Sequence, residues 1–377
     1  MIRIDEIYNH TFWPWLRDNC PGTRLFFCDP FGHARPENLF NLGNDSMVEN
    51  DYVFMHDQEP VDVDLYRDLF NEVKLRNGDI GGHFEGETWV NDFPKPPGHV
   101  VVSEKGEYVR ALCEQYGWIP HYYFYHGWAC QDWFRGYDRT FLIPRARNRT
   151  PTQTFMSPNR IVAGKRDHRV LFLYNVFKNQ LEHNHISAPR VCQYENVDIS
   201  IIAQKYANVY QDIATVFEQA ELPRLFAGEA TQQMTSCWLG NFAEAQDSLL
   251  YVPTETVYFG RRTHITEKTF KAIALEMPFV LVAPAGSLEY LREYGFKTFG
   301  NVFDESYDNE TNDIRRIESV AKLLKDLDNL TIKERQDIHR SCLPMVEHNY
   351  RHFYSGGLTE ILWRELTTML NSFTKKP

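Results

Sequence analysis

The sequence lacks the features of a membrane protein, of a secreted disulfide framework and of a zinc-binding protein. Its seven cysteines are an odd number with no C-x-x-C pair, which argues against both a disulfide framework and a zinc cluster. No apolar run approaches the roughly 20 residues that a membrane helix needs. The first residues, MIRIDEIYNHTFWPW, lack the apolar stretch of a signal peptide. We therefore expect a cytoplasmic protein with no membrane partner.

Net positive charge is also absent, because the formal net charge is -11. Binding to nucleic acid depends on neutralising phosphates, so an acidic chain needs a local basic patch for it. The densest basic run is RARNRTPTQTFMSPNRIVAGKRDHR, from Arg145 to Arg169. This run is either a solvated connector between domains or the lining of a basic acceptor groove.

What the chain does have is enough apolar sequence for two domains. It has 377 residues, of which 43% are hydrophobic and 14% aromatic. In the first half, Thr23–Pro30 and Asp51–Pro60 are strand-like, and Gly98–Gly117 predicts a strand followed by a helix that begins near Ser103. Strands that alternate with helices indicate a parallel sheet covered on both faces.

The alternation stops between Gly136 and Arg166, where arginine, asparagine, threonine and proline are typical of a connector. It resumes with the strand-like segments His168–Phe177 and Asp247–Glu255, and helices are predicted in Gly286–Phe299 and in RIESVAKLLKDLDNL. The last predicted helix has one apolar face, formed by Leu358, Ile361, Leu362, Leu366, Met369 and Leu370.

We therefore expect an α/β fold of two Rossmann-like, doubly wound domains that face a cleft. The first domain is predicted at 1–150 and the second at 166–350. A C-terminal helix is predicted in 351–377, and one option is that it packs back onto the first domain. Ligands of such folds bind beyond the carboxyl ends of the strands.

The segment HITEKTFKAIALEMPFVLVAP, His264–Pro284, carries the clearest chemistry. Thr266 is placed to cap a helix whose first turn holds Glu267 and Lys268. The amide groups and dipole of a helix start attract an anion, Lys268 adds a cation, and a carboxylate can accept both hydroxyls of a ribose. An ordinary amphipathic helix with its charges in water is the alternative interpretation of this segment. The positive charge of the preceding Gly260–Arg262 argues against it.

The longer segment LLYVPTETVYFGRRTHITEKTFKAIALEMPFVLVAP resembles the donor-binding block of GT-B glycosyltransferases, most closely the α-1,3-fucosyltransferase type. Phage-encoded glycosyltransferase-like proteins share a further pattern, which is matched here by Glu267–Lys271, Pro278–Phe279 and Leu291–Phe299. The resemblance implies that Glu267 binds ribose, Lys268 binds diphosphate and Thr266 caps the helix. It also implies that His264 lies near the nucleotide base, where the family usually has a tyrosine.

The resemblance further implies a phosphate-binding arginine after the first strand of the C-terminal domain. No arginine comes directly after the predicted strand His168–Phe177. The predicted substitutes are Lys178, with Asn175 nearby, and Arg261 or Arg262. Without that arginine, both GDP and UDP remain open as the donor nucleotide.

A transfer to a hydroxyl needs a base, which we expect at a strand end in the N-terminal half. HDQEP supplies His56, Asp57 and Glu59, and CDPFG supplies Asp29. A polar turn that caps the next helix is the alternative for each.

The aromatic stretch YFYHGW is the second candidate on the acceptor side. Its His126 and Trp128 could contact an acceptor, or they could be core residues. Neither VDVD at Val61–Asp64 nor HNH at His183–His185 has convincing metal-ligand spacing, so no metal and no cofactor are expected.

The leading hypothesis is a metal-independent, inverting glycosyltransferase that uses a nucleotide-diphosphate sugar and an acceptor hydroxyl of a glycan or small molecule. The alternatives are a phage glycosyltransferase acting on a hydroxymethylated base in DNA, in the host cytoplasm, and a non-catalytic nucleotide-binding module. The sequence sets neither the sugar nor the oligomeric state.

Overall fold

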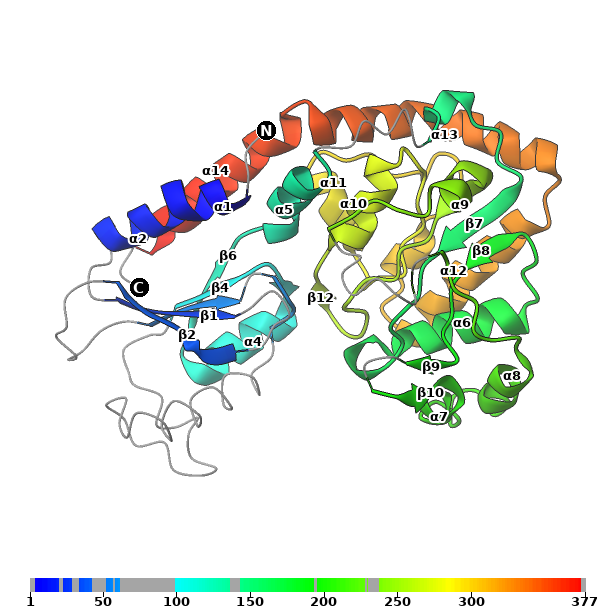
Figure 1. The fold of residues 1–377 in the computed structure, drawn as a ribbon, viewed down its shortest axis with the longest axis horizontal. Coiled ribbons are helices and arrows are strands. Elements are labelled where there is room, and N and C mark those ends of the chain that lie inside the picture. Colours follow the sequence, from blue (N-terminus) through cyan, green and yellow to red (C-terminus); the bar gives the residue numbers. More distant parts are fainter. Residues whose placement is uncertain are drawn as a thin grey trace. The chain divides into compact units, whose positions relative to one another are not determined.

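The structure is a computed structural model that describes residues 4–19, 23–28, 34–42, 52–56, 58–61, 99–135, 143–192, 195–227, 229 and 237–373. By their contacts, the residues form two compact units, one of Met1–Asp132 with Thr359–Pro377 and one of Trp133–Leu358. Each unit combines an open sheet with helices, so the chain has a mixed α/β fold (Figure 1). No described helix is both long and apolar enough to cross a membrane.

The first unit is built on a five-stranded sheet in the order β2-β1-β3-β4-β6. Its strands are β1 (Thr23–Cys28), β2 (Ala34–Leu42), β3 (Tyr52–His56), β4 (His99–Val102) and β6 (Ile119–Tyr122). Strands β1, β3, β4 and β6 run parallel, and only β2 is antiparallel. The predicted strands at Thr23–Pro30 and Asp51–Pro60 are thereby confirmed.

Helices flank this sheet on two sides in Figure 1, with α4 on one side and α14 on the other. The helices and the short strand of the unit are α1 (Ile4–Ile7), the π-helix η1 (Tyr8–Phe12), α2 (Trp13–Asn19), β5 (Lys105–Gly106), α4 (Glu107–Tyr116), α5 (Tyr125–Trp133) and α14 (Gly357–Ser372). The apolar face predicted for α14 is buried at Leu358, Leu362 and Leu366, whereas Ile361 is half-buried.

The last helix, α14, packs against α5 within the first unit. The rings of Trp128 and Trp363 meet edge to face, with 4.8 Å between their centroids. The backbone of Phe124 donates to the Glu365 carboxylate at 2.9 Å. A Cβ added at Gly127 would lie only 2.9 Å from a methyl group of Leu362, so the close approach of the two helices requires glycine there.

The second unit is built on the parallel strands β7 (Gln153–Ser157), β8 (Asn184–Ile186) and β11 (Ser248–Tyr251), in the order β11-β7-β8. The apolar segment at 279–282 extends the sheet through parallel bridges from Tyr251 to Phe279 and from Thr254 to Val282. Helix α6 (His168–Lys178) connects β7 to β8, and α10 (Glu267–Ala274) connects β11 to the bridged segment. Helix α12 (Asp313–Asp328) packs on α6 and β7, and α13 (Ile332–Tyr354) packs on α10 and β11.

The remaining elements of the second unit surround this sheet. They are η4 (Ala146–Asn148), η5 (Gly164–Arg166), β9 (Val191–Cys192), β10 (Val197–Asp198), α7 (Ile199–Gln204), α8 (Ile213–Gln219), α9 (Phe242–Asp247), β12 (Arg262–Thr263), α11 (Ser287–Glu293), η6 (Ser306–Asn309), α12 (Asp313–Asp328) and α13 (Ile332–Tyr354). The helices predicted in Gly286–Phe299 and in RIESVAKLLKDLDNL correspond to α11 and α12 and are confirmed.

The prediction of a strand at His168–Phe177 is wrong, because this segment forms helix α6. Every residue from His168 to Val176 is buried, so the helix has no polar face to reveal its period. A continuous apolar run suits a buried strand and a buried helix equally well.

One strand missing from the prediction is β7, which lies inside the predicted connector. Its residues Thr154 to Ser157 are buried, although only two of them are apolar. The Thr154 hydroxyl donates to Asp328 at 2.9 Å and the Ser157 hydroxyl donates to the Val252 carbonyl at 2.8 Å. These bonds allow polar side chains in a buried strand, and they hide the strand from a reading based on hydrophobicity.

The predicted helix start near Ser103 is also wrong, because α4 begins at Glu107. Ser103 and Glu104 are buried, and the Glu104 carboxylate accepts from the backbone of Val61 at 3.1 Å. Gly106, which precedes the helix, has φ of 134°, a conformation that a helix cannot contain. The chain therefore leaves β4 through a fixed turn before the helix starts.

Candidate functional site

A buried polar network joins the carboxyl ends of the parallel strands in the second unit. Asn159, two residues after β7, donates to the Ser157 carbonyl at 3.1 Å, and its backbone N–H donates to the Ser187 hydroxyl at 2.7 Å. Its side-chain oxygen accepts from Thr254 at 2.9 Å. Asn159 thus ties together the ends of β7, β8 and β11, at the sheet edge where α/β folds bind ligands.

Helix α10 starts at the same edge, because a buried carboxylate holds its first turn. Glu255, fully buried just after β11, accepts from the Thr266 hydroxyl at 2.5 Å and from the Thr269 hydroxyl at 2.6 Å. It also accepts from the Thr266 backbone N–H at 3.2 Å. Thr266 is the N-cap of α10, as predicted, and its hydroxyl accepts from the Lys268 N–H. The position of the helix start is therefore set by Glu255.

Glu267 and Lys268 form an ion pair in the first turn of α10, with 3.1 Å between Nζ and Oε1. The Lys268 ammonium also donates to the hydroxyls of Thr256 and Thr266, each at 3.1 Å. The side chain of Lys268 is 23% exposed and that of Glu267 is 10% exposed. In an ordinary amphipathic helix such charges would extend into water. Here hydroxyl groups hold the Lys268 charge at the edge of the sheet.

The other residues predicted upstream of α10 lie on the segment that leads into it. His264 is buried, two residues before the N-cap, and Arg262 is half-buried in β12. Arg261 is exposed. The structure brings His264 into the same short segment as Thr266, and leaves Arg261 as the most accessible cation of the segment.

Lys178 and Asn175 are not brought together with Lys268. They lie in the last turn of α6, and α6 runs from the carboxyl end of β7 back to the start of β8. This crossover puts its last turn at the edge opposite the strand ends. Lys178 forms an ion pair with Asp212 there, and the buried Asn175 amide donates to the Leu171 carbonyl at 2.9 Å.

Arg160 follows the end of β7 and was not among the residues predicted from the sequence. With β7 as the first strand of the second unit, the first arginine after that strand is the half-buried Arg160, next to Asn159. Burial raises the pKa of the nearby Glu229 carboxyl, and hydrogen bonds from Phe226 and Ser187 and the charge of Arg160 oppose that rise. The sequence TFMSPNR contains this arginine three residues after Ser157, but its place at a strand end is visible only when β7 is known to be a strand.

The acceptor-side residues belong to the first unit. His126 and Trp128 are both buried in α5, and Trp128 contacts α14, which fits core packing. Glu59 is half-buried, and His56 is the last residue of β3. Asp57 and Asp29 lie outside the described residues, as does most of the VDVD sequence.

Glu104 is a further carboxylate at a strand end that sequence reasoning assigned to a helix instead. It follows β4 by two residues, is 1% exposed and is held by the backbone of Val61 just beyond β3. A glutamate two residues after the apolar strand HVVV is the sequence signal for it. Glu104 joins the strand-end candidates for a base in the first unit.

Among the described residues, no group of three or more His, Cys, Asp or Glu side chains is arranged to hold a metal ion. In the HNH sequence, His185 instead lies 3.2 Å from Asp247. No protein-family model, curated protein or solved structure matches the chain.

Proposed function

We propose that this chain is a glycosyltransferase that moves a sugar from a nucleotide-diphosphate donor to an acceptor hydroxyl. We further propose that its two units are the Rossmann-like domains of a GT-B enzyme acting in the cytoplasm. The observation that carries the proposal is the start of α10, where Glu267 and Lys268 are fixed by Glu255 at the carboxyl end of β11. It agrees with the roles that the resemblance implies for these two residues.

In this proposal, Lys268 binds the donor diphosphate by exchanging its partners. An ammonium group has three N–H donors, and in the structure they are directed to Thr256, Thr266 and Glu267. A diphosphate oxygen would replace one of the neutral hydroxyls, because a charge-assisted hydrogen bond is the stronger one. Arg160 would add a second cation from the end of β7, and Glu267 would accept the ribose hydroxyls.

The proposed reaction is a single displacement at the anomeric carbon of the sugar. A base removes the proton of the acceptor hydroxyl, the acceptor oxygen forms a bond to the anomeric carbon, and the bond from that carbon to the diphosphate oxygen breaks. The departing diphosphate takes the electron pair, and the cations and amide groups at the start of α10 stabilise its charge. The candidate bases are Glu104 and the strand-end residues His56, Asp57, Glu59 and Asp29.

The acceptor that we favour is a glycan or a small molecule. The case for DNA depended on the basic run Arg145–Arg169, but three of its arginines have internal partners. Arg145 pairs with Glu276, Arg149 donates to the Leu275 carbonyl at 2.6 Å, and Arg169 donates to the Thr254 carbonyl at 2.8 Å. Arg149 and Arg169 are also buried, so their charges are not presented to a DNA backbone at the surface.

The test is to offer GDP-sugars and UDP-sugars, with and without hydroxymethylated DNA, and to measure release of the nucleoside diphosphate. Release that requires an added glycan or small-molecule alcohol supports the favoured acceptor, and release only with DNA replaces it with the DNA hypothesis. Binding of nucleotide without release under any condition would make the chain a non-catalytic nucleotide-binding module.

A further inference from the structure

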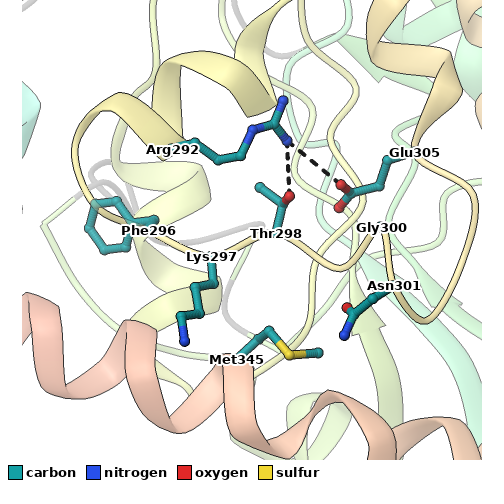
Figure 2. Close-up of a pocket in the computed structure, with 8 residues that line it drawn as sticks. All are labelled: Arg292, Phe296, Lys297, Thr298, Gly300, Asn301, Glu305 and Met345. Atoms are coloured by element: carbon teal, nitrogen blue, oxygen red, sulfur yellow. Dashed lines mark hydrogen bonds and ion pairs between the residues drawn. The ribbon is translucent and has the colours of Figure 1, made fainter.

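A cavity lies in the second unit, and neither Glu267 nor Lys268 lines it. It has a volume of about 530 Å³ and is lined by the loop that follows α11 and by α13. Figure 2 shows Lys297 and Asn301 of the loop on either side of Met345 of α13. The volume is within the range of small-molecule sites, roughly 300–1,000 Å³. The cavity shares no lining residue with the polar network at the strand ends.

The carboxylate that lines this cavity, Glu305, already has partners within the protein. Glu305 is 11% exposed on its side chain and lies 3.8 Å from the Arg292 guanidinium. Its Oε1 accepts from the backbone of Phe299 at 2.5 Å. A Cβ added at Gly300 would lie 3.0 Å from its other oxygen, so the loop passes closely around the carboxylate. Glu305 therefore holds the loop in shape.

The two cations that line the cavity, Arg292 and Lys297, are more exposed than Glu305. Arg292 uses one nitrogen for Thr298, at 3.0 Å, and keeps nearly half of its side chain exposed. Lys297 is exposed, and its ammonium group makes no ion pair with the part of the chain that the structure describes. Its backbone is nevertheless fixed, since its N–H donates to Asn349 at 2.7 Å and its carbonyl accepts from the same side chain at 2.8 Å. The exposed ammonium is thus carried by a hydrogen-bonded backbone.

The apolar part of the cavity is rigid. Met345 is 7% exposed and Phe296 is 2% exposed. The ring of Phe296 is fixed between Phe270 of α10, with 5.9 Å between centroids, and His352 of α13, with 5.0 Å between centroids. The thioether of Met345 offers a small polarizable surface to an apolar or aromatic body.

From this arrangement we propose that the cavity binds a small organic anion, with its phosphate or carboxylate at the Lys297 ammonium and its compact apolar body over Met345. The site is distinct from the proposed donor site and does not rest on the proposed function. Electrostatic attraction orients the anion, and the apolar contact makes an organic anion a better ligand than the bare ion.

The experiment titrates phenyl phosphate, benzoate and inorganic phosphate into the full chain by calorimetry. Because a phosphate could also bind at Lys268, each titration is run in the wild type and in Lys268→Ala. Lys297→Met removes the charge and keeps the length of the side chain, and Lys322→Met is the matched control on an exposed lysine of α12. Circular dichroism and thermal melting confirm that each variant is folded.

We expect phenyl phosphate or benzoate to bind at least about tenfold more tightly than inorganic phosphate, in the Lys268→Ala background as well. We expect Lys297→Met to weaken that binding at least about tenfold and Lys322→Met to leave it unchanged. A stronger response to phenyl phosphate identifies a phosphomonoester as the ligand, and a stronger response to benzoate identifies a carboxylate. No binding up to about 10 mM, binding lost in Lys268→Ala, or binding equal in wild type and folded Lys297→Met overturns the proposal.

Discussion

The ammonium nitrogen of Lys268 lies 3.1 Å from the carboxylate of Glu267, its neighbour in the chain. Consecutive residues on a helix normally point in different directions, so this contact depends on the start of α10, where the Thr256 and Thr266 hydroxyls also bind the ammonium. The pair presents one acceptor and one cation to the same edge of the sheet.

Replacing either member of this pair should weaken nucleotide binding. We expect Lys268→Ala to raise the Kd for a nucleoside diphosphate about tenfold to a hundredfold, because a charge-assisted contact to phosphate is lost. Glu267→Ala should raise it by a smaller factor and abolish any preference for a ribose over a 2′,3′-dideoxyribose. Calorimetric titration measures both constants, with the exposed Lys322→Ala as control. Unchanged affinity in both variants would remove the site assignment.

Arg160 and Lys178 distinguish the site in the structure from the one predicted from sequence. Arg160 follows β7 at the carboxyl edge, and Lys178 ends α6 at the other edge, where it pairs with Asp212. We expect Arg160→Ala to weaken diphosphate binding about tenfold and Lys178→Ala to leave it within about twofold. The opposite ranking of the two Kd values would contradict the placement of the site.

The buried carboxylate of Glu255 should control both stability and the site. Glu255→Gln keeps the shape of the side chain but replaces one of its two oxygens, each of which accepts from one hydroxyl, by an N–H₂ group. We expect a loss of about 1–3 kcal/mol in the free energy of unfolding, since buried polar groups then lack partners. Thr269→Val, which removes a single donor, should cost less, about 1 kcal/mol. Urea denaturation of the three proteins tests this order, and equal stability of Glu255→Gln and wild type would refute it.

Glu276 combines a strained backbone with an ion pair in which its own carboxylate is buried and the Arg145 side chain is 31% exposed. Its φ is 51°, which is unfavourable for a residue with a Cβ, yet its carboxylate pairs with Arg145 and accepts from the Ala146 backbone at 2.8 Å. Glu276→Ala should therefore cost about 3 kcal/mol, because it leaves Arg145 without this partner and keeps the strain. Glu276→Gly relieves the strain and should be about 1 kcal/mol more stable than Glu276→Ala. Denaturation curves decide the order; a less stable glycine variant would show that the backbone is not strained.

The first unit should lose stability as the pH falls, because its buried His121 must stay neutral. Ser372 donates its hydroxyl hydrogen to the Met369 carbonyl, so it accepts from His121 Nδ1–H, at 2.7 Å. The other nitrogen of His121 then carries no hydrogen and accepts from His99 Nδ1–H, also at 2.7 Å. Protonation of His121 would place two hydrogens against each other in that contact.

Burial, followed by the proximity of His99, lowers the pKa of His121 to about 3. The unfolded chain, with a histidine pKa near 6.5, therefore binds a proton that the folded chain does not between about pH 6.5 and pH 3. Stability is full above this window and falls by up to about 1.4 kcal/mol per pH unit within it. Urea denaturation across the window should show a smaller slope for His121→Phe than for wild type. The exposed His10→Gln serves as control, and equal slopes for His121→Phe and wild type would exclude this role.

The sequence predicted those elements whose pattern was periodic or bounded by turn residues. The cap at Thr266, the start of α10 at Glu267 and the apolar face of α14 follow directly from local residue types. Local chemistry fixes such features, because a hydroxyl at the N-cap and apolar residues at helical spacing act within one or two turns.

The sequence could not predict features that depend on partners distant in the chain. Thr154 and Ser157 are acceptable in the buried strand β7 only because Asp328 and the Val252 carbonyl accept their hydrogens. The role of Glu255 depends on Thr266 and Thr269, more than ten residues later. Without β7, nothing in the sequence marks Arg160 as a residue at a strand end, and Lys178 is the cation that the sequence offers instead.

The packing of α14 has a consequence for biosynthesis. The first unit consists of two stretches of chain, separated by the whole of Trp133–Leu358. During translation the sheet of this unit is synthesised early, and α14, which packs on α5, is synthesised last. The ring of Trp128 therefore lacks its contact with Trp363 until translation is nearly finished. Premature termination after the second unit would thus damage the first one, and a nascent chain needs protection of that apolar surface during most of its synthesis.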